Sequence, residues 1–63
     1  MPFQIIFDDL RHREVFSGST PEAAVSAARG VIDQYPEYAD MSDSEFAAYI
    51  ETNDTEFAIE EKN

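Results

Sequence analysis

Met41-Ser42-Asp43-Ser44-Glu45-Phe46 is the stretch that decides the fold, because it marks the start of a second helix. Ser42 and Glu45 have the spacing of a capping box, in which two side chains accept hydrogen bonds from backbone N–H groups at a helix start. Met41 and Phe46 lie on either side of the box and are placed for a hydrophobic staple. The sequence therefore predicts a helix that begins at Ser42.

The residues after this start predict the rest of the helix and a last strand. Phe46, Tyr49 and Ile50 share one apolar face of the helix. We expect Asn53 to end the helix in the left-handed conformation. Over residues 55–60, large apolar side chains alternate with acidic or small ones, which is typical of a half-buried strand with an acidic outer edge.

Earlier in the chain, the pattern predicts a first helix over residues 21–35. Thr20 can cap its free N–H groups, and Pro21 suits the first helical position. Apolar side chains then recur every three or four residues, which gives one buried stripe. We interpret Gly30 as a point of close approach between helix and sheet, and Pro36 stops the helix.

The start of the chain predicts a β-hairpin over residues 3–17. Residues 3–7 and 12–17 have the composition of strands, and residues 8–11 form a polar break of hairpin-loop length. The order of elements is β-β-α-α-β. We predict a single two-layer α+β domain over residues 1–63, whose three-stranded antiparallel sheet carries both helices on one face. The third strand can lie beside the first or beside the second.

The composition excludes several classes of protein. The chain has 63 residues, with 14 Asp and Glu against 4 Lys and Arg, a formal net charge of −10 and no cysteine. Without cysteine there is neither a disulfide framework nor a cysteine zinc site. No apolar run approaches the roughly 18 residues of a membrane span, and no charged-then-apolar leader opens the chain. Surfaces that bind DNA or RNA are basic, so the charge argues against direct nucleic-acid binding.

Two groups of residues carry side chains that catalysis or metal binding uses. His12 is the only histidine, and on a strand it shares a face with Glu14, so the two can pair. We interpret His12 as a solvated strand histidine. Asp40, Asp43 and Glu45 bring carboxylates close together, but a calcium loop would need a longer alternating set, a central glycine and a final bidentate Glu. We therefore expect no enzyme activity, no metal and no cofactor.

The negative charge is concentrated in the second half of the chain. Residues 1–32 carry 4 acids and 3 bases, whereas residues 33–63 carry 10 acids and 1 base. This charge either serves solubility alone or forms a face that binds a basic partner, and we predict the second. The predicted partner-binding acids are Asp33, Glu37, Asp40, Asp43, Glu45, Glu51, Asp54, Glu56 and Glu60. Tyr38 or Tyr49, where exposed, would anchor the contact, because tyrosine is frequent at binding hot spots.

Three arginines oppose this charge. Arg11 and Arg13 share a strand face close to Asp8 and Asp9, and Arg29 lies on the first predicted helix. We expect them to form local ion pairs, which contribute little where they are exposed. The alternative is a contact with an acidic residue of a partner.

In size and charge the whole chain resembles the very small acidic inhibitors of phages and mobile elements, especially anti-CRISPR proteins. Those proteins are similar in being single compact domains, often α+β, without catalytic residues. The resemblance implies a non-enzymatic inhibitor that binds a basic, nucleic-acid-binding surface of a CRISPR interference complex, by nucleic-acid mimicry or by steric block. It also implies a monomer in the host-cell cytoplasm, with no direct contact to nucleic acid or membrane.

A second resemblance is local. Residues 16–24, with Ala27 and Ala28, resemble the strand-to-helix segment of HicB-like antitoxin domains. This resemblance implies an antitoxin or another small stoichiometric protein-binding module, which would form dimers through sheet edges or apolar surface. Those domains place a further strand before their second helix, where this chain has the helix start at Ser42.

Overall fold

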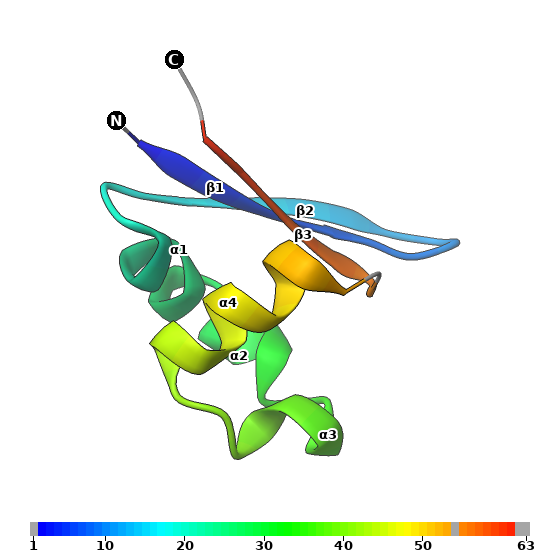
Figure 1. The fold of residues 1–63 in the computed structure, drawn as a ribbon. Helices are drawn as coiled ribbons and strands as arrows, with labels where there is room; N and C mark the ends of the chain where they lie inside the picture. Colours follow the sequence, from blue (N-terminus) through cyan, green and yellow to red (C-terminus); the bar gives the residue numbers. More distant parts are fainter. Residues whose placement is uncertain (1, 54, 62–63) are drawn as a thin grey trace.

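The computed structural model describes residues 2–53 and 55–61, which form a three-stranded sheet with helices packed against one face (Figure 1). The strands are β1 (Phe3–Asp8), β2 (Arg13–Gly18) and β3 (Phe57–Glu61). The helices are α1 (Pro21–Ala27), α2 (Arg29–Ile32), α3 (Pro36–Ala39) and α4 (Asp43–Thr52). The predicted two-layer α+β fold is therefore confirmed.

β1 is the central strand of the sheet. It pairs antiparallel with β2 along one edge and with β3 along the other, so the third strand lies beside the first. Ile5 of β1 lies opposite Phe16 of β2 and Ile59 of β3. The next inward position joins Phe7 of β1 to Phe57 of β3. Because β1 is the most apolar strand, its central place buries the most apolar surface against the helices.

Both predicted helix starts are confirmed. The Thr20 hydroxyl accepts a hydrogen bond from the backbone N–H of Ala23 at 3.1 Å. At α4, the Ser42 hydroxyl accepts from the N–H of Glu45, and the Glu45 carboxylate accepts from the N–H of Ser42, both at 3.2 Å. Met41 packs against the core beside this box. No helix in the described ranges is both long and apolar enough to cross a membrane.

The predicted first helix is wrong in its length. It is interrupted at Ala28, where φ is −89° and ψ is 1°, so the chain continues as the separate short helix α2. Helix α2 ends at Ile32, which is before Pro36 as expected, and Pro36 occupies the first turn of α3. Proline is favoured there because the N–H that it lacks has no partner within a helix.

The close approach that the sequence predicts at Gly30 lies at Gly18 instead. Gly30 is exposed, and a Cβ placed on it would meet no atom within 4 Å, so the predicted close approach is not there. The close approach is at Gly18, where a Cβ would lie 2.3 Å from the backbone nitrogen of Ala24. The end of β2 thus lies directly against the first turn of α1.

The predicted left-handed end of α4 is also wrong. Asn53 has extended backbone angles, with φ of −130° and ψ of 144°. Its side-chain amide donates a hydrogen bond to the carbonyl oxygen of Tyr49 at 2.9 Å. This bond satisfies a free carbonyl of the last turn, which is what a left-handed residue would otherwise do through its backbone.

The core lies between the sheet and the helices and is rich in aromatic rings. Phe46 of α4 and Phe57 of β3 are fully buried, and their ring centres lie 5.3 Å apart. Tyr38 of α3 joins this cluster, with its ring centre 5.3 Å from that of Phe46. Only 8% of Tyr38 is exposed, so α3 is fixed to the core through this side chain.

Arg29 makes the main polar connection among the helices. Its Nη2 atom donates to the carbonyl oxygens of Ala39 at 2.9 Å and Met41 at 2.7 Å. Its Nε atom lies 3.1 Å from the Asp33 carboxylate, and its Nη1 atom lies 3.4 Å from the Asp43 carboxylate. With only 26% of its side chain exposed, Arg29 is not the simple surface ion pair that the sequence predicts. It holds the segment between α3 and α4 in place.

Candidate functional site

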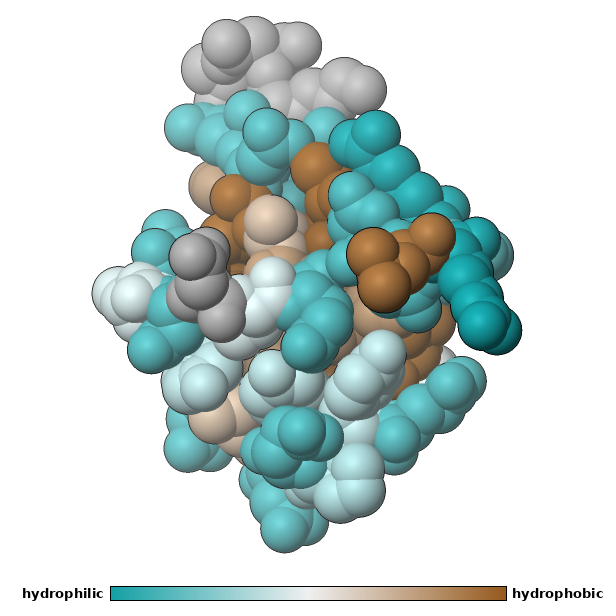
Figure 2. All heavy atoms as spheres, turned by 90° about the vertical axis from the view of Figure 1, so that its right-hand side faces the viewer, coloured by the Kyte–Doolittle hydropathy of each residue, from teal (hydrophilic) through white to brown (hydrophobic). Residues whose placement is uncertain are grey.

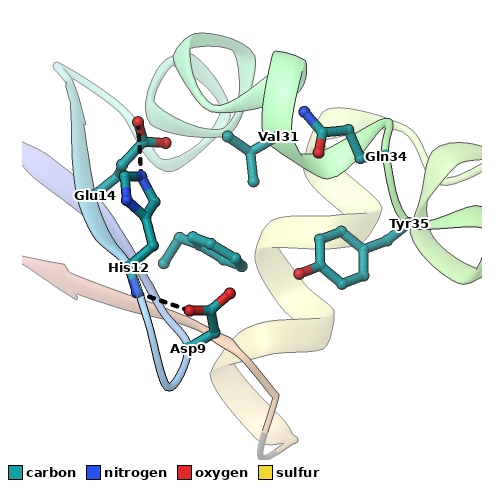
Figure 3. A pocket seen from close by; sticks show the side chains of 7 residues that line it. Asp9, His12, Glu14, Val31, Gln34 and Tyr35 are labelled. Atoms are coloured by element: carbon teal, nitrogen blue, oxygen red, sulfur yellow. Dashed lines mark hydrogen bonds and ion pairs between the residues drawn. The ribbon is translucent and has the colours of Figure 1, made fainter.

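A cavity of about 400 Å³ lies between the β1–β2 hairpin and α2 (Figure 3). It is lined by residues from the hairpin, from α2 and from the turn that follows α2. These residues are Phe7, Asp9, His12, Glu14, Val31, Gln34 and Tyr35. None of them is Lys or Arg, and two are carboxylates, so the lining is negatively charged.

Three rings form the walls of this cavity. Phe7 is 5% exposed and lies at its base, where the inward face of β1 meets the helices. The ring centre of Tyr35 is 6.0 Å from that of Phe7, in an edge-to-face arrangement, and the ring of His12 is 6.5 Å from it on the other side. Because Phe7 is part of the core, the base of the cavity is rigid, whereas its rim is polar and accessible.

The hairpin loop fixes the first carboxylate of the site. Oδ1 of Asp9 accepts hydrogen bonds from the backbone N–H groups of Arg11 and His12, both at 2.8 Å. The N–H of Asp9 donates to the carbonyl oxygen of His12 at 2.9 Å, which closes the loop. An aspartate at the start of a turn commonly bonds to the following backbone in this way. The loop conformation therefore determines where the Asp9 carboxylate points.

The second carboxylate belongs to Glu14 and pairs with His12. The Nε2 atom of His12 lies 3.1 Å from Oε1 of Glu14, so the pairing that the sequence predicts is confirmed. Glu14 lies opposite Phe7 in the sheet register, which places it on the inward face at the edge of the cavity. The exposed fractions of the two side chains are 57% for His12 and 39% for Glu14, so water reaches this pair.

Three further carboxylate effects act on Tyr35, the third ring of the cavity. Burial raises the pKa of Tyr35 above its ordinary value of 10.0, and the charges of three neighbouring carboxylates add to the effect. These three carboxylates, here called the acidic rim, belong to Glu56, Asp9 and Glu37. They come from the segment before β3, the hairpin loop and α3. The pKa of Tyr38 is raised in the same way, first by burial and then by Glu56.

These tyrosines predict a loss of stability at alkaline pH. Below about pH 9 they are protonated in both the folded and the unfolded chain, so they add no pH dependence. Above that pH the unfolded chain releases protons that folded Tyr35 and Tyr38 retain, because their folded pKa values are raised. We therefore expect the urea midpoint to fall between pH 9 and pH 11, and to fall less in Tyr38→Phe. If the urea midpoint falls equally steeply with pH in the parent and in Tyr38→Phe, the raised pKa of Tyr38 does not contribute to the loss of stability.

The predicted partner-binding acids do not all lie on one face. Asp33 and Asp43 bind Arg29, and Glu45 closes the capping box of α4. Glu60 lies opposite Gln4 on the sheet face that turns away from the helices. These four acids therefore have structural partners or lie away from the acidic rim.

The remaining predicted residues divide by exposure. Glu37, Asp40, Glu51 and Glu56 are exposed, and Glu37 and Glu56 belong to the acidic rim. Tyr38 does not meet the condition set for an anchor, because its ring is buried in the core. Asp54 lies outside the described residues.

The sequence predicts the pairing of His12 with Glu14, but it assigns no part of a binding site to Asp9, Glu14 or Tyr35. The signal that unites them is the hairpin register, which sets Glu14 opposite Phe7 and brings the loop acid Asp9 to the same end of the sheet. Tyr35 lies in the turn that follows α2, and this turn brings its ring to the cavity. No local sequence pattern predicts that contact.

Within residues 2–53 and 55–61, no three His, Asp or Glu side chains are grouped in a way that could hold a metal ion. Comparisons of the chain with protein-family models, curated proteins and solved structures found no match. The function is therefore inferred from the geometry and charge of the site itself.

Proposed function

We propose that this domain is a non-enzymatic binding protein that engages a basic protein surface through the acidic rim and the adjoining cavity. The observation that carries the proposal is the cavity lining, which brings together the carboxylates of Asp9 and Glu14 and contains no Lys or Arg. The acidic rim adds negative charge beside it, since its carboxylates raise the pKa of Tyr35 in the same lining. Like charges that approach one another cost free energy in the folded state. A partner of opposite charge relieves this repulsion, so the arrangement favours a basic partner.

The face that carries the rim is hydrophilic. Figure 2 views the molecule from the side on which the hairpin tip lies in Figure 1, and hydrophilic residues cover most of this side. Complementary charge on such a face speeds the encounter with a partner and sets its orientation. This supports recognition by charge in preference to recognition by a large apolar patch.

The target class that we propose is a nucleic-acid-binding groove. Such grooves are the most strongly basic surfaces in a cell, and carboxylates can stand in for phosphates, which occur about once per 1.7 Å along duplex DNA. The resemblance in size and charge to small phage inhibitors makes a CRISPR interference complex in the host-cell cytoplasm the particular target of this proposal. The domain would block DNA recognition as a monomer.

The test is a DNA-binding assay with purified CRISPR interference complexes of several types, each with and without an excess of this protein. We expect at least one complex to lose binding to its target duplex, and the loss to be smaller at high salt. In parallel, the immobilised protein is exposed to host lysate and eluted with duplex DNA. The proposal fails if no complex loses DNA binding and duplex DNA displaces nothing from the immobilised protein.

Neutralising the rim outside the cavity should slow association with the captured partner. In Glu37→Gln/Glu56→Gln we expect the association rate constant to fall by roughly tenfold at low salt, with a shallower salt dependence. The matched control is Glu22→Gln/Glu61→Gln, which removes the same charge from exposed positions elsewhere. Rate constants measured by surface plasmon resonance at several salt concentrations provide the comparison. Equal rates in the two variants would contradict steering by the rim.

An antitoxin-like binding module is the second candidate, and the uncovered sheet face favours it. The helices pack against one face of the sheet only (Figure 1), and Val15 on the other face is 49% exposed. Leu10 in the hairpin loop is fully exposed as well. Such a module would pair through this surface and dimerise. Light scattering decides between the two candidates, because a dimer at micromolar concentration favours the module and a monomer favours the inhibitor.

A further inference from the structure

We propose that the cavity beside the hairpin receives the guanidinium group of an arginine side chain from the basic partner. This inference rests on the proposed function and names the chemical group that the site would recognise.

The rings of the cavity suit a flat cation. The rings of Phe7 and Tyr35 touch edge to face, with their centres 6.0 Å apart, and Phe7 is only 5% exposed, so the ring surfaces open to a ligand are those of Tyr35 and His12. The cavity of about 400 Å³ between the hairpin and α2 is large enough for one long side chain. Cations bind favourably over aromatic faces at up to about 6 Å, and a guanidinium also stacks on them because it is planar. Val31 on α2 offers apolar surface to the methylene stem of the entering side chain.

The carboxylates provide the polar part of the recognition. Both hydrogen bonds that the structure gives to the Asp9 carboxylate end on Oδ1, so Oδ2 remains as an acceptor. Figure 3 shows the Asp9 carboxylate and the Tyr35 hydroxyl directed into the cavity. Glu14 adds a second negative charge at the opposite end, where His12 holds it by its Oε1 atom. A guanidinium has five donors in a fixed fork and can bond to several acceptors at once.

This geometry favours arginine over other ligands. An anionic ligand would meet two carboxylates in the lining and no Lys or Arg. A lysine ammonium would satisfy the charge but gains less from contact with an aromatic ring, because it is compact, not planar, and strongly hydrated. The combination of two carboxylates with ring walls therefore identifies a planar cation.

The test is an NMR titration of the whole 63-residue protein with N-acetyl-arginine amide. We expect saturable shifts at the ring protons of Phe7, His12 and Tyr35, with a dissociation constant on the order of millimolar for so small a ligand. The neutral citrulline analogue should leave these signals unchanged, and the lysine analogue should bind at least about threefold more weakly. Equal shifts with citrulline, equal affinity for lysine, or shifts elsewhere on the protein would overturn the proposal.

Charge-removing variants locate the binding within the molecule. Asp9→Asn keeps an Oδ1 atom for the two backbone bonds, so the double variant Asp9→Asn/Glu14→Gln should retain the loop. We expect it to bind arginine amide about tenfold more weakly than the parent protein. Glu22→Gln/Glu61→Gln, with the same change in net charge and at exposed positions, should bind like the parent. If both double variants bind arginine amide equally weakly, only net charge determines the affinity, and the proposed site in the cavity is wrong.

The outcome for the cavity can be separated from the outcome for the proposed function. The titration contains no partner, so it tests the guanidinium site alone. Salt-dependent capture of a basic partner without arginine binding would remove the cavity proposal and leave the proposed function standing. Binding of arginine amide without capture of any basic partner would remove the proposed function and leave the guanidinium site standing.

Discussion

Gly18→Ala should destabilise this domain by about 3 kcal/mol, a large part of its total stability. The added Cβ would lie 2.3 Å from the Ala24 nitrogen and 2.6 Å from the Ala23 carbonyl carbon. Both are backbone atoms in the first turn of α1, so they cannot move aside as the end of a flexible side chain could. A chain of 63 residues has a total stability of about 3–9 kcal/mol by typical per-residue values.

Gly30→Ala is the matched control for this substitution. A Cβ at Gly30 meets no atom within 4 Å, and the residue lies in α2. Alanine is favoured over glycine within helices, so we expect a gain of about 0.5–1 kcal/mol. The same chemical change at the two glycines should thus have opposite signs.

Thermal unfolding followed by circular dichroism distinguishes the two variants. For a domain of this size, 3 kcal/mol corresponds to a decrease in Tm of roughly 12–24 °C, and the gain in Gly30→Ala to an increase of a few degrees. A Gly18→Ala variant that melts within about 3 °C of the parent would show that β2 and α1 can separate at little cost.

The sequence predicts those parts of the fold that depend on neighbouring residues. The capping box of Ser42 and Glu45, the cap at Thr20 and the alternation in the strands are local, and each is present as predicted. The break at Ala28 has no such signal. Alanine is the best helix former, but Ala28 and Ile32 are both fully buried, so contacts in the core act on the chain at this point. Tertiary packing overrides helix propensity at this position.

The candidate site was predicted less well because it depends on contacts between distant segments. Charge counted along the chain indicated that the acids after residue 32 form the binding face. The fold instead assigns Asp33 and Asp43 to Arg29 and brings Asp9 from the first half to Glu37 and Glu56. The His12–Glu14 pair could be predicted, since alternate positions on one strand share a face, and Glu37 and Glu56 were predicted from their charge alone.

Arg29→Met is expected to destabilise the domain by about 2 kcal/mol, which corresponds to a decrease in Tm of roughly 8–16 °C. The variant removes the charged donor from the carbonyl oxygens of Ala39 and Met41 and the counterion from Asp33 and Asp43. Methionine can replace much of the apolar stem, so the effect reports mainly the lost polar contacts.

Arg11→Met removes the same charge from an exposed position and serves as the control. In the described part of the chain, Arg11 makes no ion pair, so we expect a change within about 0.5 kcal/mol. The two variants are compared at low salt and at about 1 M NaCl, where ion pairs are largely screened. The difference between them should persist at high salt, because the two hydrogen bonds to backbone carbonyls at 2.9 and 2.7 Å are short and part-buried.

A difference that disappears at high salt would mean that Arg29 acts only as a counterion. A difference that persists means that Arg29 holds the end of α3 and the turn after it through its hydrogen bonds to Ala39 and Met41. Helix α3 carries Glu37 of the acidic rim. In that case Arg29→Met should also weaken binding to a basic partner, even though it makes the protein more acidic. Net charge alone predicts the opposite sign, so measuring the affinity of this one variant separates a positioned acidic site from a merely acidic protein.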